Sequence, residues 1–311
     1  MAKISIENIS RIELNVIPFE RKFDLQGDAG IDTKVRDAYV SKNYDAEPKS
    51  KQEADAQGKK GFNGLMSSFT HITVHHQGDE TIVVADIAPT RYLIGQAMRD
   101  VVKASAGLSA EDVKKLSPDM ANVSLVAPVK VNGQYFLLSQ IKGKALGSGE
   151  IHAGLVAGNI DGKYLKRQNP LVAALQEECS EELGMDLSTL DHTSATYMLD
   201  ERETGQVNFA FVARNTDADK VLDSYDTSAR TKLITNEPLE VMALSLLPVA
   251  GIALVPLEGT KGLRNIECYK PTAFGLEKVH ENRGIRPYTQ ATLDYLAEPK
   301  NLKFLLEKAG F

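Results

Sequence analysis

The chain has 311 residues and a mass of 34.0 kDa, with 42% hydrophobic and 25% charged residues. This ordinary globular composition excludes a wholly disordered chain, a collagen-like chain and a small disulfide scaffold. The net charge of −6 supplies no global basic field for a nucleic-acid backbone, so we expect no nucleic-acid partner. The two cysteines, Cys179 and Cys268, are too few for a metal knuckle and are compatible with a reducing compartment.

The first residues, MAKISIENIS, lack the apolar region of a secretory signal. The longest apolar run, Val241–Leu257, is interrupted by Pro248, Gly251 and Pro256, so we expect no transmembrane span. The sequence therefore predicts a cytoplasmic protein with no membrane partner.

Residues 1–118 predict an N-terminal α+β domain of unknown role. The patterns indicate strands within 3–18, a hairpin over 70–88 that turns at Gly78-Asp79, a helix over 91–104 and a short helix over 109–116. Residues 35–61 are polar and nearly free of large aliphatic side chains, which predicts an exposed insertion.

Residues 119–311 predict a second domain in which helices and strands are mixed, so the fold class is α/β. Alternation predicts a hairpin over 123–143 around Asn132-Gly133, strands over 193–199 and 207–215, and a strand with a glycine loop over 149–164. Helical spacing predicts helices over 169–184, 287–299 and 301–311. The run at 238–249 fits a strand or the start of a helix.

The helix over 169–184 carries the candidate site. Asn169 suits an N-cap, Pro170 the first helical position and Gly184 the position after the helix. Glu178, Glu181 and Glu182 fall within an arc of about 100° beside its apolar stripe. Their carboxylates repel one another by about half a kcal/mol for each exposed pair.

A solvated acidic face is the simplest interpretation of these glutamates. However, no Lys or Arg occurs within 169–184, and two carboxylates lie at the helix end where the dipole disfavours anions. A divalent cation would relieve both problems, and all-oxygen ligands favour Mg²⁺ or Mn²⁺. The sequence therefore predicts metal binding by Glu178, Glu181 and Glu182.

The run from Glu178 to Met185 (ECSEELGM) resembles the core of the Nudix box, with Gly158 in the place of its opening glycine. The resemblance implies a Nudix-type α/β/α sandwich with a mixed sheet over 119–311. It also implies a Mg²⁺-dependent pyrophosphohydrolase that acts on a nucleoside diphosphate linked to another moiety, such as a nucleotide-sugar or a dinucleotide. The three glutamates would be its catalytic metal ligands. ADP-sugar pyrophosphatases of this kind carry N-terminal extensions that dimerise or cap the substrate, so a homodimer is one role for residues 1–118.

Two positions depart from the box. Glu177 stands where the family has an arginine that orients the first metal glutamate, and Asn169 stands where it has an early glutamate. Arg167 or Lys166 is a candidate to replace the arginine, and Asp161 or Glu150 to replace the early glutamate. These departures leave open a catalytically inactive, Nudix-like module that senses a ligand.

A general base is expected from loops that face the helix, and the candidates are Glu201, Glu203, Glu237 and Glu240. Each is more often a surface charge. The aromatic side chains of Tyr197, Phe209 and Phe211 are of a kind that stacks on a nucleobase, but their alternation favours the core.

Two other patterns compete with this interpretation. His71, His75 and His76 cluster on one expected strand. Only His71 and His75 share a face of that strand, and a metal site needs a third ligand, so surface or packed histidines are favoured. Gly27–Asp32 (GDAGID) and Gly158–Tyr164 (GNIDGKY) resemble two motifs of dUTPases, in which Asp161 would activate water and Tyr164 would pack on the sugar. The separation of the two motifs is far too long for that family, and its Gly-rich C-terminal motif is missing.

Overall fold

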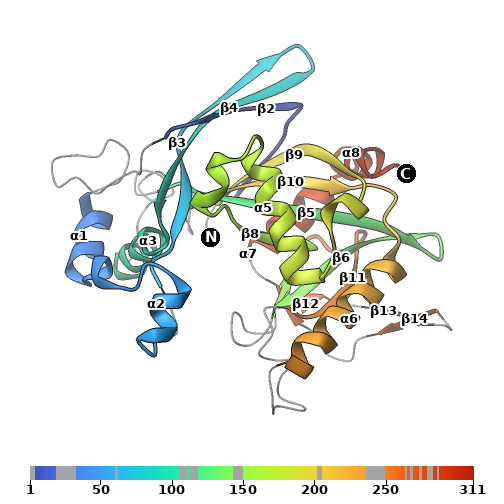
Figure 1. The fold of residues 1–311 in the computed structure, drawn as a ribbon. Coiled ribbons are helices and arrows are strands. Elements are labelled where there is room, and N and C mark those ends of the chain that lie inside the picture. Colours follow the sequence, from blue (N-terminus) through green and yellow to red (C-terminus); the bar gives the residue numbers. More distant parts are fainter. Residues whose placement is uncertain are drawn as a thin grey trace. The chain divides into compact units, whose positions relative to one another are not determined.

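A computed structural model describes residues 4–18, 33–59, 62–105, 109, 111, 118–142, 150–201, 205–235, 249–262, 265–266, 269–272, 275–278, 283–285 and 287–311. The fold is mixed α/β, as the sequence predicts (Figure 1). The chain divides into two compact units. Unit 1 comprises Met1–Val123, Asn159–Ala174 and Tyr197–Phe209, and unit 2 comprises Ser124–Gly158, Leu175–Thr196 and Ala210–Phe311. The expected boundary at residue 118 lies near the first division, and two later segments also belong to unit 1.

Unit 1 contains a long hairpin of β3 (Leu65–Gln77) and β4 (Glu80–Arg91). It turns at Gly78, whose φ of 61° lies in the left-handed region that favours glycine, and this confirms the turn expected there. β2 (Arg11–Val16) pairs parallel with β4. β1 (Ser5–Asn8) pairs antiparallel with the last residues of β9 (His192–Glu201). Parallel and antiparallel pairs therefore coexist, so the sheet is mixed.

Two helices of unit 1, α1 (Thr33–Ser41) and α3 (Tyr92–Ala104), lie side by side (Figure 1). A 3₁₀ turn η1 (Tyr44–Ala46) and helix α2 (Lys51–Ala56) follow α1. The α1–α3 contact is a small core made of Val35, Tyr39, Ile94, Ala97, Met98 and Val101. Most described side chains over 35–59 are exposed, as expected, but Val35 and Tyr39 are buried and anchor a short helix on α3.

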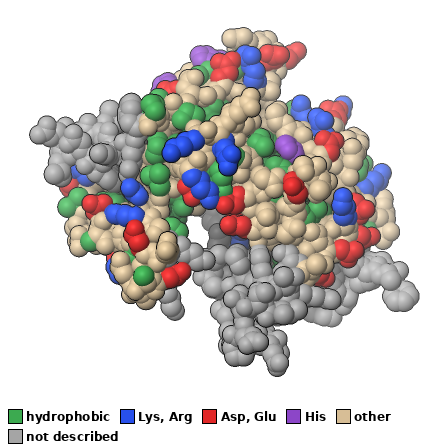
Figure 2. Space-filling view, in the orientation of Figure 1, with side chains coloured by type: hydrophobic (Ala, Val, Ile, Leu, Met, Phe, Trp, Pro, Cys, Tyr) green, Lys and Arg blue, Asp and Glu red, His purple; other side chains and the backbone are tan. Residues whose placement is uncertain are grey.

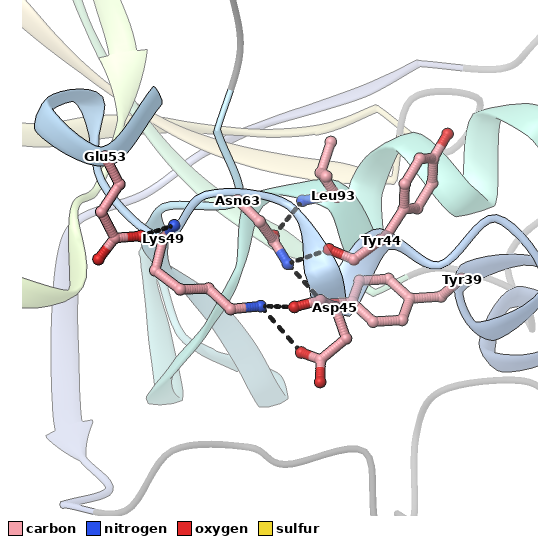
Figure 3. Close-up of polar contacts among 7 residues, drawn as sticks. All are labelled: Tyr39, Tyr44, Asp45, Lys49, Glu53, Asn63 and Leu93. Carbon is pink, nitrogen blue, oxygen red and sulfur yellow. Dashed lines mark hydrogen bonds and ion pairs between the residues drawn. The ribbon is translucent and has the colours of Figure 1, made fainter. Parts of the chain in front are cut away.

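A buried amide, Asn63, ties this helical region together (Figure 3). Its Nδ2 donates to the Tyr39 hydroxyl at 2.5 Å and to the Tyr44 carbonyl oxygen at 3.1 Å. Its Oδ1 accepts the backbone N–H of Leu93 at 3.0 Å. Both N–H groups and the carbonyl oxygen of the amide are thus partnered, so its burial leaves no polar atom unpaired.

The sheet of unit 2 runs in the order β5-β6-β11-β13-β14, and neighbouring strands are antiparallel. The strands are β5 (Met120–Val131), β6 (Gln134–Lys142), β11 (Val249–Pro256), β13 (Tyr269–Thr272) and β14 (Gly275–Lys278). β5 and β6 turn through Asn132 and Gly133, whose φ values of 50° and 84° are the two positive angles of a type I′ turn. The hairpin expected around these two residues is confirmed.

Two short strands join this sheet: β7 (Ile151–His152) pairs with β6, and β8 (Val156–Asn159) pairs with β5. A separate two-stranded sheet consists of β12 (Asn265–Ile266) and β15 (Arg283–Gly284). β9 and β10 (Gln206–Ala213) correspond to the strands expected over 193–199 and 207–215.

The remaining described helices include those predicted over 169–184, 287–299 and 301–311, together with others that the sequence does not predict. They are η2 (Gly162–Lys166), α5 (Pro170–Glu178), a π turn (Cys179–Leu183), η4 (Leu187–Thr189), α6 (Ala218–Thr235), α7 (Pro287–Leu296) and α8 (Pro299–Ala309). The two C-terminal helices are confirmed, with ends within three residues of those expected. Within the described residues, no helix is long and apolar enough to cross a membrane.

Several expected features lie outside the described residues. They are Gly27–Asp32, most of the helix at 109–116, the run 238–248, Cys268, Glu203, Glu237 and Glu240. On the face drawn in Figure 2, basic and acidic side chains of the described residues are intermixed. No single-sign surface dominates this view, which agrees with the composition.

Candidate functional site

The helix that carries the glutamates begins as the sequence predicts and then changes its period. Asn169 caps it, since its Oδ1 accepts the backbone N–H of Val172 at 3.2 Å, and Pro170 follows. After Glu178 the helix continues as a π turn and ends at Gly184, whose φ is 68°. A π turn holds one more residue than an α turn and often marks a functional position. The three glutamates thus straddle the junction between α5 and the π turn.

Glu182 is the buried member of the set, with a relative exposure of 9%. Its Oε2 accepts hydrogen bonds from Gln140 Nε2 at 2.5 Å and from the backbone N–H of Ala157 at 3.2 Å. Its Oε1 accepts the Lys142 ammonium at 2.9 Å. A buried carboxylate with a cationic partner and two further donors is held in one position.

The glutamates were expected to lack a basic partner, and Lys142 shows that this expectation is wrong for Glu182. The segment 169–184 contains no basic residue, but the positive charge that compensates Glu182 comes from β6, 40 residues earlier in the chain. The acidic turn is therefore partly neutralised without a metal ion. A metal ion would therefore have to be bound by groups that this ion pair leaves without a partner.

Gln140 and Lys142 lie two residues apart on β6 and therefore on the same face of the strand. The amide orientation of Gln140 is fixed, because its Nε2 donates both to Glu182 and, at 2.7 Å, to the Leu155 carbonyl oxygen. Its Oε1 is buried and has no hydrogen-bond partner. An orphaned buried oxygen beside a carboxylate fits a site that takes a further donor or a cation.

Glu178 is half-buried and lies against Gly158 at the end of β8. A Cβ atom added to Gly158 would lie 1.7 Å from Glu178 Oε1, so only glycine leaves room for this carboxyl group. Burial, then the charges of Glu182 and Glu181, raise the pKa of Glu178 to about 8, although Lys142 opposes the shift. Glu178 therefore keeps its proton at neutral pH in the metal-free chain.

The other residues of this turn are not held in the same way as Glu178 and Glu182. Glu181 is exposed and Glu177 is half-buried. Cys179 is buried, and burial followed by the charge of Glu182 raises the pKa of its thiol to about 12, so it is unreactive as a nucleophile. In the part of the chain that the structure describes, no three Asp, Glu, His or Cys side chains are placed to hold a metal ion together. The donor set is therefore the pair Glu178 and Glu182, with the oxygen of Gln140 beside it.

Several other candidate residues belong to unit 1. Asp161 caps η2 by accepting the backbone N–H of Lys163 at 2.8 Å, and Arg167 is exposed just after that turn. Both belong to unit 1, as does Glu201, which is buried at the end of β9. Tyr197, Phe209 and Phe211 are buried, which confirms the core interpretation. His71, His75 and His76 are exposed on β3, in agreement with surface histidines.

A groove of about 530 Å³ is found elsewhere in unit 2. It is lined by Tyr135, Leu257, Glu258, Gly259, Ala297, Pro299, Leu302, Lys303, Leu306, Glu307 and Phe311. None of these residues belongs to the set around Glu182. This groove is therefore not part of the candidate site.

Sequence reasoning missed Gln140 and Lys142. The available signal was two polar residues, spaced by two, at the end of the otherwise apolar run QYFLLSQIK. No family model matches this chain, and no curated protein matches it. The site is therefore interpreted from its own geometry and from the motif resemblance.

Proposed function

We propose that this chain is a Nudix-type, Mg²⁺-dependent hydrolase of a diphosphate anhydride, with the α/β/α sandwich of that family in its second half. The single observation that carries the proposal is the Glu178–Glu182 pair, in which one carboxyl group requires Gly158 and the other is held by three donors. The proposed substrate is a nucleoside diphosphate linked to another moiety, a class that comes from the motif resemblance.

The residues present fit Mg²⁺ or Mn²⁺. Mg²⁺ in phosphate-handling sites is bound by one or two carboxylates together with waters and substrate phosphates, and not by a closed protein cage. Glu178 and Glu182 would supply the carboxylates, and the orphaned Gln140 Oε1 would supply a neutral oxygen. Glu181 is exposed in the same turn. When bound, the ion would neutralise phosphate charge and acidify a water molecule.

Residues of this chain position and orient the two carboxyl groups of the proposed site. Gln140 and the Ala157 N–H fix one oxygen of Glu182, so the other oxygen faces Lys142 in a defined direction. Gly158 leaves space for Glu178, which sits close enough to Glu182 for each charge to affect the other. A proton acceptor outside this pair comes from the candidates Glu201, Glu203, Glu237 and Glu240, of which the structure describes Glu201 in unit 1.

The test is a substrate screen of the purified chain with millimolar Mg²⁺ or Mn²⁺. Nucleotide-sugars, dinucleotides, coenzyme A and nucleoside triphosphates are incubated separately, and release of a nucleoside monophosphate is followed by chromatography. We expect turnover of at least one diphosphate-linked compound, abolished by EDTA and retained in Glu181→Gln to a larger extent than in Glu182→Gln. Absence of turnover for every class overturns the hydrolase.

A second candidate function is a ligand-sensing module without catalysis. It is favoured by the Lys142–Glu182 ion pair, which already neutralises one carboxylate, and by Glu177 in the place of the family's arginine. Under this alternative the same compounds raise the melting temperature but are recovered intact. Selective cleavage of dUTP would instead support the dUTPase-like interpretation, in which Asp161 is the essential group.

A further inference from the structure

The ion pair between Lys142 and Glu182 is enclosed, with side-chain exposures of 11% and 8%. Ion pairs elsewhere in the described chain, such as Lys59–Glu47 at 41% and 35%, are open to water. Removing one partner of a buried pair leaves the other charge uncompensated, so either ion needs a counter-ion to stay in place. Lys142 is thus the counter-ion of Glu182 as the structure stands.

The two oxygens of Glu182 are not equivalent. Oε2 accepts two hydrogen bonds, from Gln140 and from the Ala157 N–H, which use both of its lone pairs. Oε1 accepts only the Lys142 ammonium among the contacts at this carboxylate. A cation that binds Glu182 therefore binds through Oε1, where it meets the ammonium.

A second, independent observation shows that a polar atom next to Glu182 lacks a partner. Gln140 is fully buried, and its Oε1 has no partner, while its amide nitrogen is bound to Glu182 itself. A buried carbonyl oxygen without a donor costs free energy unless a ligand, water or cation satisfies it. Two features thus occur together around Glu182: the Lys142 ammonium is bound to Oε1 of the carboxylate, and the Oε1 atom of Gln140 has no partner.

From this arrangement we infer that Lys142 is a built-in competitor of the divalent cation. A Mg²⁺ or Mn²⁺ ion binds Glu182 by displacing the Lys142 ammonium from Oε1, and Lys142 thereby sets how much free cation the protein requires. The inference rests on the proposed function, since it assigns a regulatory role to a residue of that same site. Lys142 is a positioning residue and not a metal ligand.

The experiment is a titration of the intact chain with Mn²⁺ alone, in which free Mn²⁺ is measured by electron paramagnetic resonance. The variants are Lys142→Met, which removes the ammonium, and Lys142→Arg, which keeps a cation. The matched control is Lys130→Met on β5, an exposed lysine that lies over the Tyr135 ring and makes the same change in net charge. Lys142→Gln, which retains a donor for Glu182, is the second variant if Lys142→Met does not fold.

We expect Lys142→Met or Lys142→Gln to bind Mn²⁺ about tenfold more tightly than the natural sequence, whereas Lys142→Arg and Lys130→Met stay within about threefold of it. An unchanged or weaker affinity in the neutral variants overturns the inference. Equal binding by all variants, together with turnover in the substrate screen, removes the inference and leaves the hydrolase intact. Tighter binding without any turnover keeps the inference and removes the hydrolase. No Mn²⁺ binding by any variant removes both.

Discussion

Two buried polar centres of this protein, one in each unit, differ in how completely they are satisfied. Asn63 in unit 1 has a partner for both N–H groups and for its carbonyl oxygen, and it carries no charge. The Glu182 centre in unit 2 has an ion pair, a second carboxyl group with a raised pKa and an orphaned oxygen on Gln140. A closed network of the first kind stabilises a fold. An open network of the second kind retains capacity for a ligand.

The largest expected effect comes from a substitution in the Glu182 centre, which we call the open centre. Glu182→Gln should lower the hydrolysis rate at least about a hundredfold, because a carboxylate that binds the metal contributes several kcal/mol to the transition state. Single-turnover rates on the substrate found in the screen measure this loss, and circular dichroism checks the fold. Asp161→Asn, which alters the cap of η2 and removes the ion pair with Lys163, should lose much less. The reverse order of losses would contradict the assignment.

A substitution in the Asn63 centre should lower the stability of the fold and leave the hydrolysis rate unchanged. Asn63→Ala leaves the Leu93 N–H and the Tyr39 hydroxyl without this partner, which costs about 2 kcal/mol. The measurement is the melting temperature of the chain and its Mn²⁺ affinity. Asn15→Ala is the matched control, since Asn15 is exposed and bonds only to Asp86. If both variants melt at the same temperature, the buried amide is not a centre of stability.

Gly158→Ala tests the fit of Glu178 in the open centre. The new methyl group collides with the carboxyl group, so Glu178 has to move, and we expect about a tenfold loss of Mn²⁺ affinity. Gly251→Ala provides the control, because a Cβ there would meet only Ile141 at 3.6 Å. Unchanged Mn²⁺ binding by Gly158→Ala would show that Glu178 is not part of the metal site.

The raised pKa of Glu178 predicts a pH dependence of stability in the metal-free protein. Between the ordinary value of 4.5 and the folded value of about 8, the folded chain keeps a proton that the unfolded chain releases. The free energy of unfolding should therefore fall as the pH rises through this window. Urea denaturation in EDTA measures it. Glu178→Gln should flatten the slope, and an equally steep slope in that variant would place the proton elsewhere.

The smallest effect is expected at Glu177, which adds to the rise in the pKa of Glu178. Glu177→Arg reverses this charge, so it should lower the pKa of Glu178 and raise stability at pH 8 by a few tenths of a kcal/mol. Any weak hydrolysis should increase if the arginine orients Glu178 as it does in the Nudix box. A large loss of both stability and activity would indicate a separate role for Glu177.

The local features of the site were readable from the sequence. Asn169, Pro170 and Gly184 define where the helical segment begins and ends, because capping depends on neighbours within a few residues. The two hairpin turns at Gly78 and at Asn132-Gly133 were predictable for the same reason. The glutamates of the segment were correctly placed on a helical turn, although Glu181 is exposed while Glu182 is buried.

What the sequence could not give is contact between distant segments. Lys142 compensates Glu182 from another element, and no spacing rule connects residues 40 positions apart. Helix α1 was missed because its stabilisation comes from packing on α3 and not from its own polar composition. The change from α to π period was also hidden, since periodicity arguments assume a constant 3.6 residues per turn.

The π turn makes the site sensitive to chain length. An α turn would need one residue fewer between Glu178 and Gly184, and the exposed Ser180 lies within that stretch. Deleting Ser180 would keep every glutamate, but it would convert the π turn to an α turn and shorten the spacing of Glu178 and Glu182 from four residues to three. The angle between these two side chains around the helix axis would therefore change. The relative orientation of the two carboxyl groups thus depends on a serine that contacts neither of them in the proposed site.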